Sequence, residues 1–166
     1  MKYYLKENFH LLVADGQLLN ELGEAVYTYE NEFSLLPKVH LYRDGEEIGR
    51  VEKAWTFFMM KYDLYLRGEF VDSLTQKMKM FGSRFEFPQL GWHVEGDFAG
   101  LNYRIYDEHG NLAAEADQEI LTMTQRFFID IRQEEYEDLI ILLVIAINQF
   151  DKDIRSRNSA SVHVHI

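Results

Sequence analysis

The feature that most constrains the fold is an uninterrupted apolar run of nine residues near the C-terminus, residues 139–147. Acidic residues precede the run, and Lys152, Arg155 and Arg157 follow it, which is the charge distribution that a helix dipole favours. A helix over this run has no polar face and must be buried all round. It is much shorter than the about 20 residues of a membrane span. The sequence therefore predicts a buried helix at about residues 134–153, with a β-strand as the competing interpretation.

The chain before this run has the pattern of short β-strands separated by turns. In residues 127–132 apolar and polar residues alternate, as they do in a strand with one buried face. A motif with Leu-Tyr followed by Gly-Glu occurs in residues 38–46 and again, 23 residues later, in residues 61–69. A weaker copy spans residues 103–111. Each unit predicts strand, tight turn and strand, so the motif indicates a series of antiparallel hairpins.

These two features together predict the fold class. A sheet of about a dozen strands usually curls or closes. A barrel with more than about eight strands has room for a central helix. We therefore predict a mainly β fold, a closed antiparallel barrel of about 12 strands that encloses one C-terminal hydrophobic helix. The barrel domain is expected over residues 1–155, with a flexible tail over residues 156–166. A plugged barrel leaves no deep internal pocket for a substrate.

Composition and motifs exclude several classes of function. The net charge of −11 argues against nucleic-acid binding that depends on overall positive charge. The sequence has no cysteine, which excludes disulfides, thiolate metal sites, cysteine nucleophiles and lipid anchors on cysteine. It contains no phosphate loop, dinucleotide fingerprint, nucleophile elbow or zincin helix. We therefore expect a non-enzymatic protein with no cofactor and no catalytic residues.

One segment, residues 50–84, differs in charge from the rest of the chain. It holds seven basic and four acidic residues, a balance of +3, so the remainder carries −14. It is also rich in aromatic residues and methionine, and lysines beside apolar side chains are typical of surfaces that bind anionic headgroups or peptides. The alternative is that the apolar residues face the barrel interior and the lysines are solvated. The predicted ligand or membrane surface consists of Lys53, Trp55, Lys61, Lys77, Lys79 and Arg84.

Other groups of residues suggest weaker candidate sites. His93, Glu95 and Asp97 share one face of an expected strand, where they could form a metal or acid/base site, although a solvated outer strand face is the favoured explanation. The histidines at positions 163 and 165 could bind a metal, but they lie in the expected tail. The acids of residues 134–138 could bind a cation, although the helix dipole already accounts for them.

Several motifs resemble those of the LURP-one-related family, and they extend over residues 3–150. They are Gly91-Trp92-x-Val94-Glu95-Gly96-Asp97-Phe98, Tyr103-x-Ile105-Tyr106-Asp107, Phe127-x-Ile129-Asp130-Ile131 and the apolar run. The resemblance implies a bacterial member of the superfamily that also contains the tubby C-terminal domain and the phospholipid scramblases. It also implies a twelve-stranded antiparallel barrel around a hydrophobic helix.

The resemblance adds a class of ligand without assigning residues to it. Tubby-like members bind phosphoinositides through basic residues and scramblases act at membranes, so a phospholipid or a protein partner on the outer surface is the expected ligand. Neither scramblase activity nor a lipid-binding residue is carried over to this chain. The expected location is the cytoplasm, at the periphery of a membrane. A metal-dependent or acid/base enzyme and a purely structural or assembly module stay open as alternatives.

Overall fold

The computed structural model describes residues 1–10, 13–32, 34–55, 60–75, 84–97, 102–121 and 124–161. In chain order the elements are β1 (Lys2–His10), β2 (Val13–Leu19), β3 (Ala25–Glu32), β4 (Lys38–Arg43), β5 (Glu46–Trp55), β6 (Met60–Leu66), β7 (Glu69–Thr75), β8 (Arg84–Phe87), β9 (Trp92–Asp97), β10 (Asn102–Tyr106), β11 (Leu112–Leu121), β12 (Thr124–Ile131), the 3-10 helix η1 (Glu134–Tyr136) and α1 (Glu137–Ser161).

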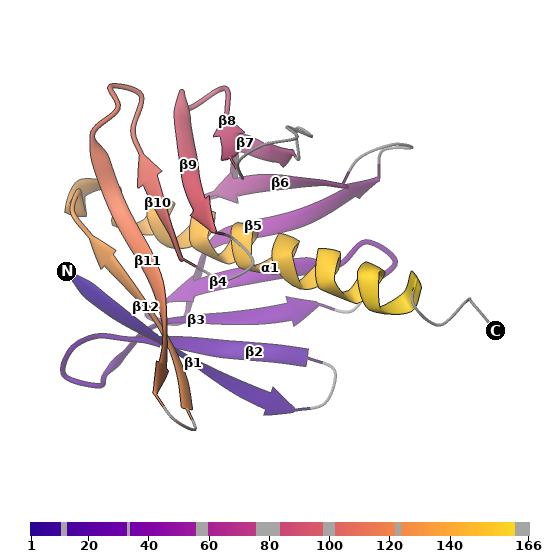
Figure 1. The fold of residues 1–166 in the computed structure, drawn as a ribbon, viewed down its shortest axis with the longest axis horizontal. Helices are drawn as coiled ribbons and strands as arrows, with labels where there is room; N and C mark the ends of the chain where they lie inside the picture. The colour runs from indigo at the N-terminus through magenta and orange to yellow at the C-terminus, as the bar shows by residue number, and fades with distance from the viewer. Residues whose placement is uncertain are drawn as a thin grey trace.

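The twelve strands form one antiparallel sheet that curls around α1 (Figure 1). Consecutive strands pair with one another except β7 and β8, and β1 pairs with β12, so the sheet begins at β7, passes through β1 and β12 and ends at β8. The predicted fold, a nearly closed 12-stranded barrel with one C-terminal helix, is confirmed. Within the described residues, no helix combines the length and the apolar character that crossing a bilayer would require.

The internal repeat of the sequence is a repeated hairpin with a bulge at an equivalent position. The two-residue turns at 44–45 and 67–68 have positive φ at both residues, as type I′ turns require. The inward-facing Leu41 and Leu64 are each followed by a shift of register, and the weaker copy has the same shift after Ile105. Bulges bend a strand and increase its twist. The repeat therefore supplies curvature at three places in the barrel wall.

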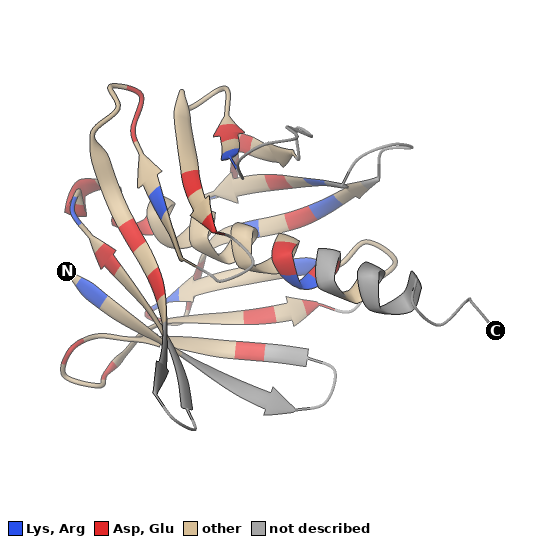
Figure 2. Cartoon of the chain, viewed as in Figure 1, with Lys and Arg blue, Asp and Glu red and all other residues tan. Residues whose placement is uncertain are grey.

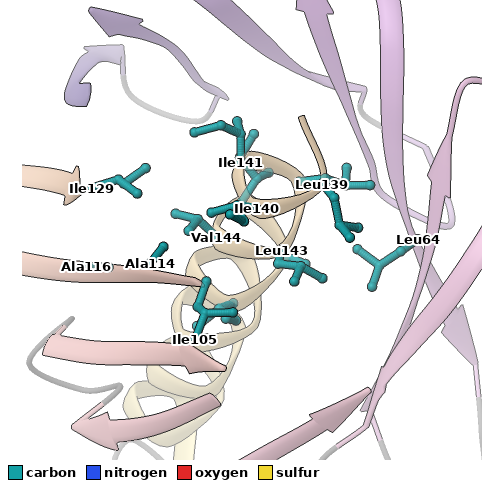
Figure 3. Close-up of a cluster of buried hydrophobic side chains, with 14 of the residues drawn as sticks. Leu64, Ile105, Ala114, Ala116, Ile129, Leu139, Ile140, Ile141, Leu143 and Val144 are labelled. Carbon is teal, nitrogen blue, oxygen red and sulfur yellow. The ribbon is translucent and has the colours of Figure 1, made fainter. Parts of the chain in front are cut away.

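Helix α1 fills the interior of the barrel. All nine residues of the apolar run 139–147 are buried, which confirms the helix rather than the strand. Figure 3 shows Leu143 pointing towards Leu64 on β6, while Val144 points towards Ala114 on β11. The helix thus packs against strands from both halves of the sheet, and its side chains occupy the space that a ligand would need.

The helix is longer than the sequence pattern indicates. It extends beyond residue 153 to Ser161, into the segment that was expected to be a tail. Burial ends near Asp151, and Ser156 is exposed. The end of the apolar sequence pattern therefore marks the point where the helix leaves the barrel, whereas the helix itself continues. Lys152 and the basic residues after it consequently lie within the helix, and its last turn contains no basic residue.

The barrel has a seam where the two terminal strands of the sheet, β7 and β8, lie side by side. Among the described residues, no backbone ladder joins them. The carboxylate of the buried Asp72 on β7 instead accepts hydrogen bonds from the backbone N–H groups of Gln89 (2.8 Å) and Leu90 (3.0 Å), in the turn after β8. It also accepts one from Ser73 N–H at 2.7 Å. A single carboxylate therefore fastens the seam.

Substitution of Asp72 by alanine is expected to lower the free energy of unfolding by about 2 kcal/mol, because it leaves three part-buried N–H donors without their acceptor. Hydrogen exchange at the Gln89 and Leu90 amides should accelerate more than exchange elsewhere in the barrel. Asp72→Asn, which keeps one oxygen acceptor, serves as the control and should lose less. Unchanged exchange at these two amides in the alanine variant would contradict this role for the carboxylate.

Candidate functional site

The end of the barrel from which α1 leaves is the part of the structure that bears on the predicted ligand surface. Figure 1 shows the outer part of the helix leaving on the side where β3, β5 and β7 end and where β4 and β6 begin. We call this end the exit rim and define it by the described residues Leu35, Leu36, Lys38, Lys53 and Lys61. Strand pairing brings them together, since β4, β5 and β6 are adjacent. Two of the six predicted surface residues, Lys53 and Lys61, belong to the rim.

Lys53 points into the mouth of the barrel. It lies opposite Tyr62, a buried residue of β6, so both side chains are on the inner face of the sheet. Its Nζ is 2.7 Å from Asp153 Oδ2 on the emerging helix, and the Tyr62 hydroxyl donates to the same oxygen. Trp55 follows as the last residue of β5. Lys53 therefore ties the helix to the wall at the point where burial ends.

The other predicted surface residues are placed differently. Lys61 lies opposite Ala54, on the outer face, with its Nζ 2.9 Å from Asp63 Oδ1. Arg84 begins β8, across the seam from β7, and its guanidinium is 2.7 Å from Glu95 Oε1. Each described basic side chain of the predicted surface thus has a carboxylate partner. Lys77 and Lys79 lie outside the described residues, as do the histidines at positions 163 and 165.

A polar cluster surrounds the start of α1 at the opposite end of the barrel. Glu137 Oε1 accepts hydrogen bonds from the hydroxyls of Tyr3 (2.5 Å) and Tyr27 (2.7 Å). Asp138 Oδ1 is 2.7 Å from both the Tyr27 hydroxyl and Arg43 Nη1. Arg43 also stacks over the Tyr27 ring at 5.1 Å. These acids, which were read from the sequence as helix-dipole compensation or a cation site, bind the barrel wall through tyrosine and arginine.

The cluster shifts the pKa values of Tyr27 and Asp138 in opposite directions. Burial, followed by the hydrogen bonds to Glu137 and Asp138, raises the pKa of Tyr27 far above its usual value. Burial also favours a raised pKa for Asp138, but hydrogen bonds from Tyr27 and Arg43 outweigh it and hold that pKa below its usual range. Tyr27 therefore stays neutral and donates, while Asp138 stays charged and accepts. This arrangement anchors the helix start and presents no free acid/base pair.

The His93, Glu95 and Asp97 row lies on β9 as expected, and His93 and Glu95 contact each other and side chains of the neighbouring strands. His93 stacks on Tyr106 at 4.9 Å, and its Nε2 is 3.6 Å from Glu95 Oε1. Glu95 in turn pairs with Arg84. Within the described part of the chain, no three His, Cys, Asp or Glu residues are grouped so as to hold a metal ion. The row is accounted for by ion pairing and ring stacking on the outer face of the sheet.

Charge is distributed unequally between the two ends of the barrel. Figure 2 shows basic residues at the rim ends of β5 and β6 with acidic residues beside them, and acidic residues on the β2–β3 loop and at the start of the helix. The turns at the helix-start end are rich in acids: Glu21, Glu24, Asp44, Glu46, Glu47, Glu69, Glu108, Glu134 and Glu135. Arg43 and Arg67 lie at the same end, and the lysines of the exit rim are each paired with a carboxylate, so the helix-start end is the more acidic of the two and the rim carries charges of both signs.

Comparisons with known proteins give a family and a fold. No curated protein matches the chain. A crystal structure of a protein from Arabidopsis thaliana has a similar fold, with a TM-score of 0.55 over 87% of this chain and 89% of the other, at 11% sequence identity. The model of the family described as LURP-one-related matches residues 1–148. On this match, together with the barrel and its central helix, the chain belongs to the LURP-one-related family.

Proposed function

We propose that this chain is a non-enzymatic, tubby-like barrel of the cytoplasm that binds the surface of an anionic phospholipid bilayer through its exit rim. The grouping of partly exposed lysines with exposed leucines at the exit rim carries the proposal. Lysines there can exchange their carboxylate partners for anionic headgroups, whereas a negative surface repels the acidic turns at the opposite end of the barrel. The burial of α1 among the described strands supports a role for the outer surface, because its side chains fill space that an internal substrate would need.

The residues at and next to the exit rim suit contact with headgroups. Lys61 and Lys38 have partly exposed side chains at the starts of β6 and β4. The connection from β7 to β8, residues 76–83, adds Lys77 and Lys79 from the sequence. Each lysine near a membrane surface contributes about 1 kcal/mol of attraction to anionic lipid. Several such lysines, acting together, give reversible and salt-sensitive binding.

Vesicle flotation tests the proposal directly. The wild-type chain should float with vesicles that contain phosphatidylserine, should remain unbound with pure phosphatidylcholine, and should dissociate as the salt concentration rises. Neutralising Lys61, Lys77 and Lys79 with glutamine should abolish flotation. A matched control neutralises Lys2, Arg104 and Arg132, which are exposed residues on other elements, and should retain it. Failure of the wild-type chain to float on either mixture would exclude the bilayer as its ligand.

Removal of the Lys53–Asp153 ion pair is expected to change the affinity for anionic vesicles. Asp153→Asn removes the carboxylate that holds Lys53 at the mouth of the barrel and leaves its ammonium free for a headgroup. Affinity for phosphatidylserine vesicles, measured by co-sedimentation, should rise about fivefold, the equivalent of about 1 kcal/mol. The control is Asp130→Asn on β12, which removes the carboxylate partner of Arg132. It makes the same charge change away from the rim, so it should alter the affinity less than Asp153→Asn does. Equal gains in the two variants would contradict a specific role for Lys53.

A further inference from the structure

We infer that Leu35 and Leu36, in the loop between β3 and β4, insert into the bilayer when the exit rim docks; this inference rests on the proposed function. Leu35 is 95% exposed and Leu36 is 39% exposed. Neither leucine therefore contributes much to the core. Adjacent exposed leucines at the rim of a barrel are the kind of apolar tip that peripheral proteins bury at the level of the headgroups and the upper acyl chains.

The loop holds the two leucines away from the core. Ser34 Oγ donates a hydrogen bond to the carbonyl of Leu36, which closes the tip of the loop on itself. The carbonyl of Pro37 accepts a hydrogen bond from Lys53 N–H at 3.1 Å, which fixes the end of the loop to β5. The leucines are thus presented on an ordered support, and docking costs less conformational entropy than it would for a free segment.

Lys38 and Lys53 lie next to the loop, at the level where the headgroups are found when the two leucines are inserted. Lys38 follows directly, with its Nζ 3.6 Å from Glu52 Oε1, and Lys53 is joined to the loop through Pro37. Lysine ammonium groups behind an apolar tip lie at the level of phosphate and carboxylate headgroups when the tip is buried. Apolar insertion and electrostatic attraction then act in the same direction.

A second exposed leucine elsewhere in the chain provides the comparison. Leu22 is 83% exposed in the β2–β3 turn, at the acidic end of the barrel, with Glu21 and Glu24 beside it. Isolated exposed leucines are common on protein surfaces and need no function. Leu22 matches Leu35 in residue type and exposure. The acidic side chains beside Leu22, however, are repelled by an anionic bilayer. Any effect shared by the two positions would therefore reflect general hydrophobicity.

The experiment compares partition of three full-length proteins into vesicles of phosphatidylcholine with phosphatidylserine. Replacing both rim leucines with serine, L35S together with L36S, should weaken partition at least about tenfold, since two apolar side chains no longer leave water when the rim docks. L22S should stay within twofold of the wild type. Thermal unfolding of all three proteins should be alike, because the substituted side chains are exposed.

A position-specific probe separates insertion from an indirect effect. Leu35→Trp should show a blue-shifted emission, relative to the wild-type spectrum, that brominated phospholipid quenches on binding. If the wild-type chain binds vesicles but the double serine variant binds equally well, or the new tryptophan is not quenched, insertion is overturned while the proposed function stands. If the wild-type chain binds neither kind of vesicle, both are overturned, and the exposed leucines indicate a protein-binding surface instead.

Discussion

Replacing Leu143 with alanine is expected to lower the free energy of unfolding by about 3–4 kcal/mol, as buried leucines typically do. Leu143 lies near the middle of the buried part of α1, is fully inaccessible to solvent and points towards Leu64 on β6 (Figure 3). The helix is held by strands on several sides, so neither it nor the wall can move inward to fill the space that the side chain leaves. Urea denaturation, monitored by far-UV circular dichroism, measures the loss.

Leu22→Ala is the matched control for this prediction. The substitution deletes the same atoms from a side chain that is largely in solvent, in a turn at the acidic end of the barrel. Its cost should be no more than about 0.5 kcal/mol. A loss of less than about 1 kcal/mol for Leu143→Ala would mean that the helix packs loosely inside the barrel, and the argument that its interior excludes a ligand would fail.

Gly96→Ala is expected to destabilise the barrel by about 3 kcal/mol or more, although the change adds a single methyl group. Gly96 has φ +144° and lies opposite Tyr103 in the β9–β10 pair. A Cβ atom at this position would be 2.4 Å from the carbonyl oxygen of Asn102 and 2.6 Å from Tyr103 Cα. These neighbours are backbone atoms, so they can move only if the two strands separate.

Gly110→Ala separates backbone strain from steric contact. Gly110 has φ +79° in the β10–β11 turn, and a Cβ atom there would have nothing within 4 Å. Its substitution should therefore cost only the intrinsic penalty of a left-handed conformation, about 1–2 kcal/mol. Comparison of the two midpoints of urea denaturation tests the difference, and equal losses would mean that the close approach of β10 to Gly96 is relieved without cost.

The parts of the fold that local patterns specify could be predicted from the sequence. The Asp-Gly and Arg-Gly turns determine hairpins because a type I′ turn needs only two residues with positive φ. The run 139–147 is buried because it has no polar face in a helix. Many hairpins together with one such helix predict a barrel whose wall is formed by the hairpins and whose interior is filled by the helix. These signals predicted the fold, whereas the family was indicated by the resemblance of several motifs.

The interactions between distant residues could not be predicted. Tyr3 and Glu137 are 134 positions apart, and only the closed barrel brings them into contact. Lys53 was grouped with Lys61 by composition, yet one side chain faces inward and the other outward, because the direction depends on pairing register. The seam at Asp72 was missed for the same reason: which two strands end a sheet depends on topology, and a lone aspartate in a strand carries no signal of it.

The pairing of β1 with β12, followed by a helix that fills the centre, also determines when this protein can fold. β1 obtains one of its two neighbours only after β12 has been synthesised, and the apolar helix that fills the barrel follows still later. Until then the apolar faces of the hairpins are exposed to solvent and favour aggregation. Because so many contacts join distant parts of the sequence, folding is expected to be slow, to wait for β12 and α1, and to depend on chaperones that shield the incomplete barrel wall.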